Sequence, residues 1–255
     1  MAPVHIESDG LVRIISIDRP AARNAVDGDT ARDLYAAFEE FDADPISSVA
    51  ILTGRSGTFC AGADLKAIGT SRANQVHSEG PGPMGPTRMV LSKPVIAAVE
   101  GFAVAGGLEL ALWCDLRVAA TNATFGVFCR RWGVPLIDGG TIRLPRLIGH
   151  SRAMDMILTG RSVSGAEALE FGLVNRLCDP GAALGTAIEL AHQLAQLPQN
   201  CLRGDRTSTI EQWGRTEPDA LRREYEIGLA VLMSGESQAG AQRFSDGAGR
   251  HGVTA

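Results

Sequence analysis

No apolar run in this 255-residue sequence is long enough to cross a membrane. The longest, residues 94–112, is interrupted by Glu100 and several glycines, whereas a membrane-spanning helix needs about 20 consecutive apolar residues. The first ten residues carry His5, Glu7 and Asp9 in place of the basic start and apolar centre of a signal peptide. We therefore expect no membrane association and a cytoplasmic location.

Clusters of basic or metal-binding residues are also missing. The net charge is −5, and no basic stripe runs along the chain, which argues against nucleic acid as a partner. The five cysteines are widely spaced, with no CxxC pair and no His/Cys cluster. This pattern predicts neither a disulfide framework nor a metal site.

Short apolar or β-branched segments alternate with helical patterns along most of the chain. Strands are predicted at residues 11–18, 48–53, 94–99, 115–120, 124–127 and 173–176. Helices are predicted at residues 27–43, 108–114, 141–148, 151–158, 164–171 and 182–197, and as a broken pair over 217–242. The alternation predicts an α/β core, residues 1–195, followed by a helical region, residues 196–255.

Residues 78–87 contain three glycines and three prolines, a composition that predicts a mobile loop without regular structure. This loop would be either a lid or a simple connection.

Two glycine-containing segments, residues 60–65 and 101–110, each lead from a strand into a helix. The start of a helix presents free backbone N–H groups and the positive end of the helix dipole, which together suit an anion. One such turn alone is commonly a packing feature. Two of them indicate a place where the backbone approaches a ligand.

These segments and their neighbours resemble the enoyl-CoA hydratase/isomerase family, also called crotonases, over nearly the whole chain. The matching residues are 18–20, 23–25, 59–65, 93–101, 106–111, 114–115, 125–126, 139–141, 143–144, 148–149, 158–160, 167–169 and 172–175. The resemblance implies a spiral of ββα units with a C-terminal helical trimerisation region. It also implies homotrimers that often pair into hexamers, and an acyl-CoA thioester substrate with no separate cofactor and no metal.

By this resemblance, the backbone N–H groups of Ala61 and Gly106 form an oxyanion hole for the thioester oxygen. Removing one such fixed donor typically costs about 3–4 kcal/mol of transition-state stabilisation. The substrate and its coenzyme A part would lie along Arg23, Ala25, Ala61, Gly62, Ala63, Asp64, Leu65 and Gly106. Arg23 would either meet a phosphate or remain an exposed surface charge.

The acid/base residues match the family only in part. Hydratases of the family use two glutamates, and Glu109 matches the first; its apolar neighbours predict burial and a raised pKa. The second glutamate falls at Cys129, which we interpret as a small side chain that shapes the pocket. Asp138 is the nearest replacement carboxylate, and it would act as an acid/base, as the N-cap of the following helix, or as both. Trp132 would either line the acyl pocket or pack in the core.

The leading hypothesis is therefore an enoyl-CoA hydratase with Glu109 as its main acid/base and Asp138 as a second. One alternative is an enoyl-CoA or dienoyl-CoA isomerase, or a β-diketone C–C hydrolase, that uses the same two carboxylates. Another is a non-catalytic acyl-CoA-binding protein that lost its chemistry with the second glutamate.

Overall fold

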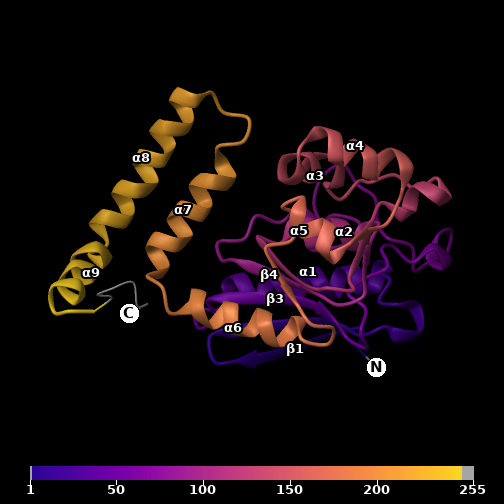
Figure 1. Cartoon of the computed structure of the whole chain (residues 1–255), viewed down its shortest axis with the longest axis horizontal. Coiled ribbons are helices and arrows are strands. Elements are labelled where there is room, and N and C mark those ends of the chain that lie inside the picture. The colour runs from indigo at the N-terminus through magenta and orange to yellow at the C-terminus, as the bar shows by residue number, and fades with distance from the viewer. Residues whose placement is uncertain (1, 249–255) are drawn as a thin grey trace. The chain divides into compact units, whose positions relative to one another are not determined.

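The computed structural model describes residues 2–248, and the chain divides after Ala195 into two compact units (Figure 1). A six-stranded sheet forms the centre of the first unit. Its first two strands are antiparallel and the other neighbours are parallel. In spatial order the strands are β1 (Val4–Asp9), β2 (Val12–Ile17), β3 (Val49–Gly54), β4 (Val95–Val99), β6 (Leu116–Ala120) and β9 (Arg176–Cys178).

A second, three-stranded sheet contains β5 (Phe102–Val104), β7 (Thr124–Gly126) and β8 (Val163–Ser164). Strands β4 and β6 of the large sheet are each followed directly by a strand of this small sheet, and then by a helical segment. This is the expected spiral of ββα units, and the α/β prediction is confirmed.

Six α-helices complete the first unit: α1 (Gly28–Ala43), α2 (Gly106–Trp113), α3 (Gly140–Ile148), α4 (His150–Thr159), α5 (Gly165–Glu170) and α6 (Ala183–Ala195). Helix α1 begins as the sequence predicts, because the Asp27 carboxylate accepts the backbone N–H of Thr30. Its apolar stripe, Leu34, Phe38 and Phe41, is fully buried.

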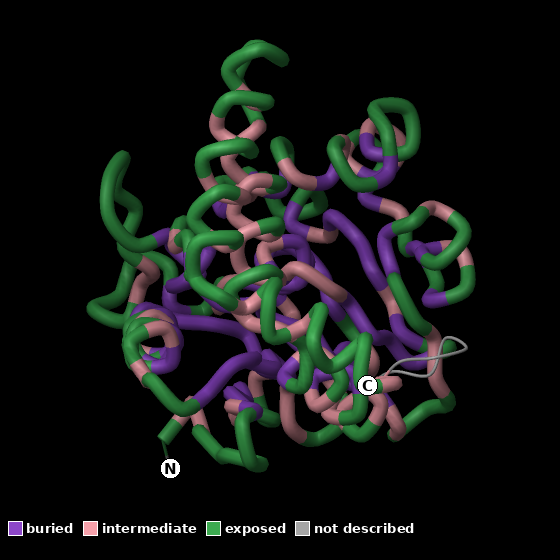
Figure 2. The backbone as a smooth tube through the Cα atoms, turned by 90° about the vertical axis from the view of Figure 1, so that its left-hand side faces the viewer, coloured by how far each residue is buried: buried purple, intermediate pink, exposed green. Residues whose placement is uncertain are grey.

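Both faces of the large sheet are covered, which explains its continuous apolar strands. Successive side chains of a strand point to opposite faces. In β3, accordingly, Ala50 and Leu52 join the core that contains α1 and α2, whereas Val49 and Ile51 pack with α6. Figure 2 shows buried residues mainly toward the inside of the chain and exposed residues mostly around its outside.

The second unit consists of α7 (Gln199–Glu211), α8 (Glu217–Met233) and α9 (Glu236–Ser245). Helices α7 and α8 are joined by an ion pair in which Arg223 Nε lies 2.7 Å from Glu211 Oε2. No side chain of these three helices is buried within the described chain. Many apolar side chains of this unit are therefore left uncovered.

Several local predictions were incomplete. Strand β1 and helix α7 were missed, and β5 lies inside the segment interpreted as a turn. The strand expected at residues 173–176 is displaced to Arg176–Cys178, because the N–H of Leu173 still bonds the carbonyl of Ala168 at the end of α5. The segment of residues 60–65, which was expected to lead into a helix, leads only into a short 3₁₀ turn, Leu65–Ala67. None of the helices within residues 2–248 is both long enough and apolar enough to span a bilayer.

Candidate active site

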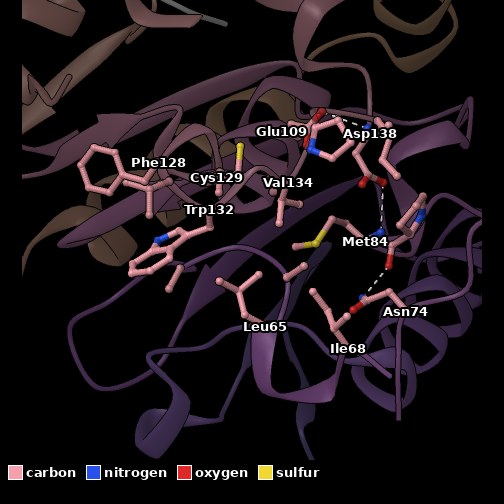
Figure 3. A pocket seen from close by; sticks show the side chains of 18 of the residues that line it. Leu65, Ile68, Asn74, Met84, Glu109, Phe128, Cys129, Trp132, Val134 and Asp138 are labelled. Atoms are coloured by element: carbon pink, nitrogen blue, oxygen red, sulfur yellow. Dashed lines mark hydrogen bonds between the residues drawn. The ribbon is translucent and has the colours of Figure 1, made fainter. Parts of the chain in front are cut away.

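A cavity of about 640 Å³ opens between the two glycine-containing segments and the stretch that precedes α3 (Figure 3). Most of its lining is apolar. Two buried carboxyl groups, those of Glu109 and Asp138, line it, as do Cys129 and Trp132. Trp132 is 71% exposed, so it borders the cavity rather than packing in the core.

Gly62 allows the first segment to approach the start of α2 closely. Its φ is +100°, and a Cβ placed there would lie 2.8 Å from Ala105 Cβ and 3.1 Å from the Gly106 nitrogen. An L side chain at this position would be strained and would clash. The close approach brings the backbone of residues 61–63 to the start of α2.

The available backbone donors at this junction are the N–H groups of Ala63 and Gly106. Both residues line the cavity, and neither N–H has a hydrogen-bond partner among the described residues. Gly106 follows Ala105, whose φ of +55° is uncommon for alanine, and it is the first residue of α2. The pair thus presents two unused donors beside one cavity.

The prediction that Ala61 supplies a donor was wrong. Its N–H already donates to the carbonyl oxygen of Arg23, at an N···O distance of 3.1 Å. The turn at Gly62 separates this occupied N–H from the free N–H of Ala63. Within the same motif, the N–H that has no partner among the described residues is that of Ala63, two residues later.

Glu109 lies one helical turn after Gly106, and its side chain is buried. Its Oε1 accepts the backbone N–H groups of Asp138 (2.9 Å) and Gly140 (2.8 Å). Its Oε2 accepts no hydrogen bond from the described residues. The pKa of this carboxyl is raised to about 7, because burial and the nearby charge of Asp138 raise it by more than the two backbone donors lower it.

Asp138 is also buried, and its Oδ1 accepts the N–H of Met84 (3.0 Å) and the hydroxyl of Thr87. Burial raises the pKa of this carboxyl above its ordinary value. The N-cap interpretation was wrong: Gly139 is the N-cap of α3, and the Asp138 carboxylate accepts its hydrogen bonds from Met84 and Thr87 instead of from this helix. The carboxylate instead turns toward the segment that contains Met84 (Figure 3).

This segment is the second half of the glycine- and proline-rich stretch. Residues 82–87 are buried, and Pro86–Arg88 forms a short 3₁₀ turn, so the prediction that the whole stretch lacks regular structure was wrong. The Arg143 guanidinium donates to the carbonyl oxygens of Asp138 (2.9 Å) and Thr87 (2.7 Å). Three hydrogen bonds therefore tie this wall of the cavity to Asp138 and α3, and a fourth joins Asp138 to α3.

Cys129 lies in the cavity wall with a buried side chain. Burial raises the pKa of its thiol, and the charge of Glu109 adds to the effect. Arg130 donates to the Ile157 carbonyl, whereas Arg131 stacks over Phe128. The thiol therefore stays protonated at neutral pH, which fits a side chain that shapes the pocket.

Only part of the expected coenzyme A site lines the cavity. Five of the predicted residues line it: Arg23, Ala61, Ala63, Leu65 and Gly106. The others, Ala25, Gly62 and Asp64, do not.

Ala25 and Asp64 instead hold Arg19, which donates to the Ala25 carbonyl and, at 3.0 Å, to Asp64 Oδ2. Arg23 is exposed, and its guanidinium has no partner within residues 2–248.

Sequence reasoning missed Asn74, Met84 and Thr87, which all contribute to the cavity or to its wall. They lie in a segment that composition describes only as irregular. Their contacts reach residues 48 to 54 positions away, so no local pattern could have indicated them.

The sequence matches the family model for enoyl-CoA hydratase/isomerase over residues 7–248. The chain belongs to this family. It is 36% identical to the enoyl-CoA hydratase EchA19 of Mycobacterium tuberculosis, over 94% of this chain and 92% of that protein. It is also 36% identical to the mevalonyl-coenzyme A hydratase sidH of Aspergillus fumigatus, over 89% and 85% of the two chains.

A solved enoyl-CoA hydratase from Mycobacterium tuberculosis H37Rv has the same fold as this family member. The TM-score is 0.92 at 38% identity, and the match covers 96% of each chain. The predicted family membership and the crotonase-like fold are therefore confirmed.

Proposed function

We propose that this family member is an acyl-CoA hydratase, a lyase that adds water across the 2,3 double bond of an enoyl-CoA thioester or removes it. The observation that carries this proposal is the pair of unused N–H groups, Ala63 and Gly106, on the same cavity as the free oxygen of Glu109. The names of the two relatives, an enoyl-CoA hydratase and a mevalonyl-coenzyme A hydratase, agree with it.

In this mechanism the thioester oxygen lies between the two N–H groups. The Glu109 carboxylate removes a proton from water while the water oxygen bonds to Cβ, and the double-bond electrons move onto the thioester oxygen. The two fixed donors stabilise the enolate without reorganising. A proton then passes to Cα from the carboxyl of Glu109 or of Asp138, and a pKa of about 7 suits Glu109 to both giving and taking a proton near neutral pH.

The coenzyme A part would leave the cavity past Leu65 toward Arg23, whose guanidinium has no partner among residues 2–248 and suits a phosphate group. The reaction needs no separate cofactor, since coenzyme A belongs to the substrate. We also propose that the protein works in the cytoplasm as a homotrimer or a pair of trimers. The uncovered apolar side chains of α7–α9 support such an assembly.

The substitution Glu109→Gln tests the chemistry. It keeps the size of the side chain and an oxygen for the Asp138 and Gly140 N–H groups, but removes the base. We expect kcat for hydration to fall about 100-fold or more, with the Kd for a saturated acyl-CoA ester nearly unchanged. The exposed Glu39→Gln is the matched control. Unchanged turnover in Glu109→Gln would refute the proposal.

A second candidate is an isomerase or a β-diketone C–C hydrolase. It is favoured by one observation, that Asp138 lines the cavity while Cys129 stands where the family's second glutamate is expected. Product analysis with enoyl-CoA, dienoyl-CoA and β-diketone substrates would separate these reactions. If Asp138→Asn changed turnover of none of them, this candidate would be excluded. Tight acyl-CoA binding with no turnover of any substrate would instead indicate a binding protein.

A further inference from the structure

Beyond the two carboxyl groups, one side of the cavity is apolar except for a single uncharged polar side chain. Its lining there includes Ile68, Val76, Pro83 and Met84, and the polar exception is Asn74. Figure 3 shows Asn74 and Ile68 on the same side as Met84 and Asp138, and Trp132 on the opposite side. With the thioester at the N–H pair and coenzyme A leaving past Leu65, an acyl chain beyond Cβ would extend toward Asn74.

Two hydrogen bonds fix the orientation of the Asn74 amide. Its Nδ2 donates to the carbonyl oxygens of Val26 (3.1 Å) and Pro83 (2.8 Å). Because a carbonyl oxygen only accepts, the amide cannot be reversed without losing both bonds. The Oδ1 atom is left with no hydrogen bond from any described residue, although the side chain is half-buried.

The anchors of this amide also fix it relative to the reacting atoms. Val26 pairs with Ala63 as an isolated bridge, so one anchor belongs to the backbone next to an oxyanion donor. Pro83 precedes Met84, whose N–H bonds Asp138. The Met84 sulfur lies so close to Gly106 that a Cβ placed there would be 2.6 Å away. Asn74 Oδ1 is therefore a preorganised acceptor at a fixed position in the acyl part of the cavity.

We propose that Asn74 is a specificity-determining residue, and that this cavity takes acyl-CoA thioesters whose acyl chain carries a hydroxyl group beyond Cβ. The hydroxyl would donate to Oδ1 and leave the apolar walls to the rest of the chain. An unsubstituted chain would cover this acceptor without replacing its hydrogen bond to water, which is unfavourable. The inference rests on the proposed function only in placing an acyl thioester in this cavity.

The test uses matched acyl-CoA esters in which one carbon beyond Cβ carries either a hydroxyl or a methyl group, with the position moved along the chain. Calorimetry with the saturated esters requires no turnover. We expect one hydroxyl position to bind about five- to tenfold more tightly than its methyl counterpart. With the corresponding 2-enoyl esters, the ratio of kcat/KM values should show the same preference.

The variants Asn74→Leu and Asn74→Ala should reduce the hydroxyl-to-methyl ratio, both of affinities and of kcat/KM values, to one or below. Both variants also lose the bonds to Val26 and Pro83, which lowers binding of all esters but does not by itself change the ratio. Asn122→Ala, in an exposed turn, should keep the wild-type ratio. Equal affinities for every hydroxyl and methyl pair, in a protein that still hydrates simple enoyl-CoA esters, would overturn this proposal and leave the proposed function intact. If the wild-type protein hydrated no enoyl-CoA ester but still bound one hydroxyl ester more tightly than its methyl counterpart, the proposed function would be overturned and the present proposal would stand.

Discussion

A carboxylate buried on an apolar helix destabilises a fold unless it is protonated or fully bonded. Glu109 is in this position, because its Oε1 is bonded whereas its Oε2 accepts no hydrogen bond from residues 2–248. Its pKa of about 7, against an ordinary value of 4.5, reflects the free-energy cost of ionising the carboxyl group in a buried position. In the proposed mechanism the same property suits the group to act as an acid and a base near neutral pH, so stability and the proposed chemistry oppose each other at this residue.

The substitution Glu109→Gln should therefore stabilise the protein in a pH-dependent way. Below pH 4.5 the carboxyl is protonated in the folded and unfolded chains alike, and the variant should match the wild type. Between pH 4.5 and about 7 the unfolded chain ionises first, so wild-type stability falls with rising pH, whereas the amide is unaffected. At pH 8 the shift corresponds to about 3 kcal/mol in favour of the variant.

Urea denaturation at pH 4 and at pH 8 would measure this difference. The exposed Glu39→Gln should change the free energy of unfolding at neither pH. Equal stability of wild type and Glu109→Gln at pH 8 would show that the buried charge carries no such cost.

At the scale of elements, the wall formed by residues 82–87 depends on contacts with α3 rather than on its own secondary structure. The Thr87 hydroxyl and the Met84 N–H both bond Asp138 Oδ1, and Arg143 bonds the backbone carbonyls of Thr87 and Asp138. Occupying Oδ1 in this way leaves Oδ2 as the Asp138 oxygen available to a substrate. The wall and the carboxyl group are thus held as one unit.

Thr87→Val tests this unit, because valine has the shape of threonine without the hydroxyl. We expect the free energy of unfolding to fall by about 1–3 kcal/mol, since a buried carboxylate oxygen loses one of its two donors. Thr87→Ser keeps the hydroxyl and should retain most of the stability. If the valine and serine variants were equally stable in urea denaturation, the hydroxyl would not be what holds the wall.

The same contacts explain what the sequence could and could not predict. Helix α1 and strands β2–β4 follow from local periodicity and capping, so their positions were predicted closely. The proposed donor at Ala63 was not predicted, because the N–H of Ala61 bonds the carbonyl of Arg23, 38 positions earlier in the chain and outside any local pattern. Strand β1 was missed because its exposed side chains are mostly polar, and β5 because it is only three residues long.

At the scale of the whole molecule, the exposed apolar residues of α8 call for a partner surface. Leu221, Tyr225, Leu229 and Leu232 recur every three or four residues, so they lie on one face of the helix, and each is at least 42% exposed. A contiguous apolar face of this kind on a folded protein usually marks an interface. It supports the proposed assembly of three or six copies.

Leu229→Lys should dissociate that assembly, because a charge in the middle of a buried apolar interface would be desolvated without a partner. Sedimentation velocity should show the wild type at three or six times the chain mass, and the variant shifted toward the monomer. Ala230→Lys places the same charge about 100° around the helix, away from this face, and should leave the mass unchanged. If Leu229→Lys sedimented like the wild type while Ala230→Lys dissociated, the interface would lie on a different face of α8. A monomeric wild type would mean that this apolar face serves another partner.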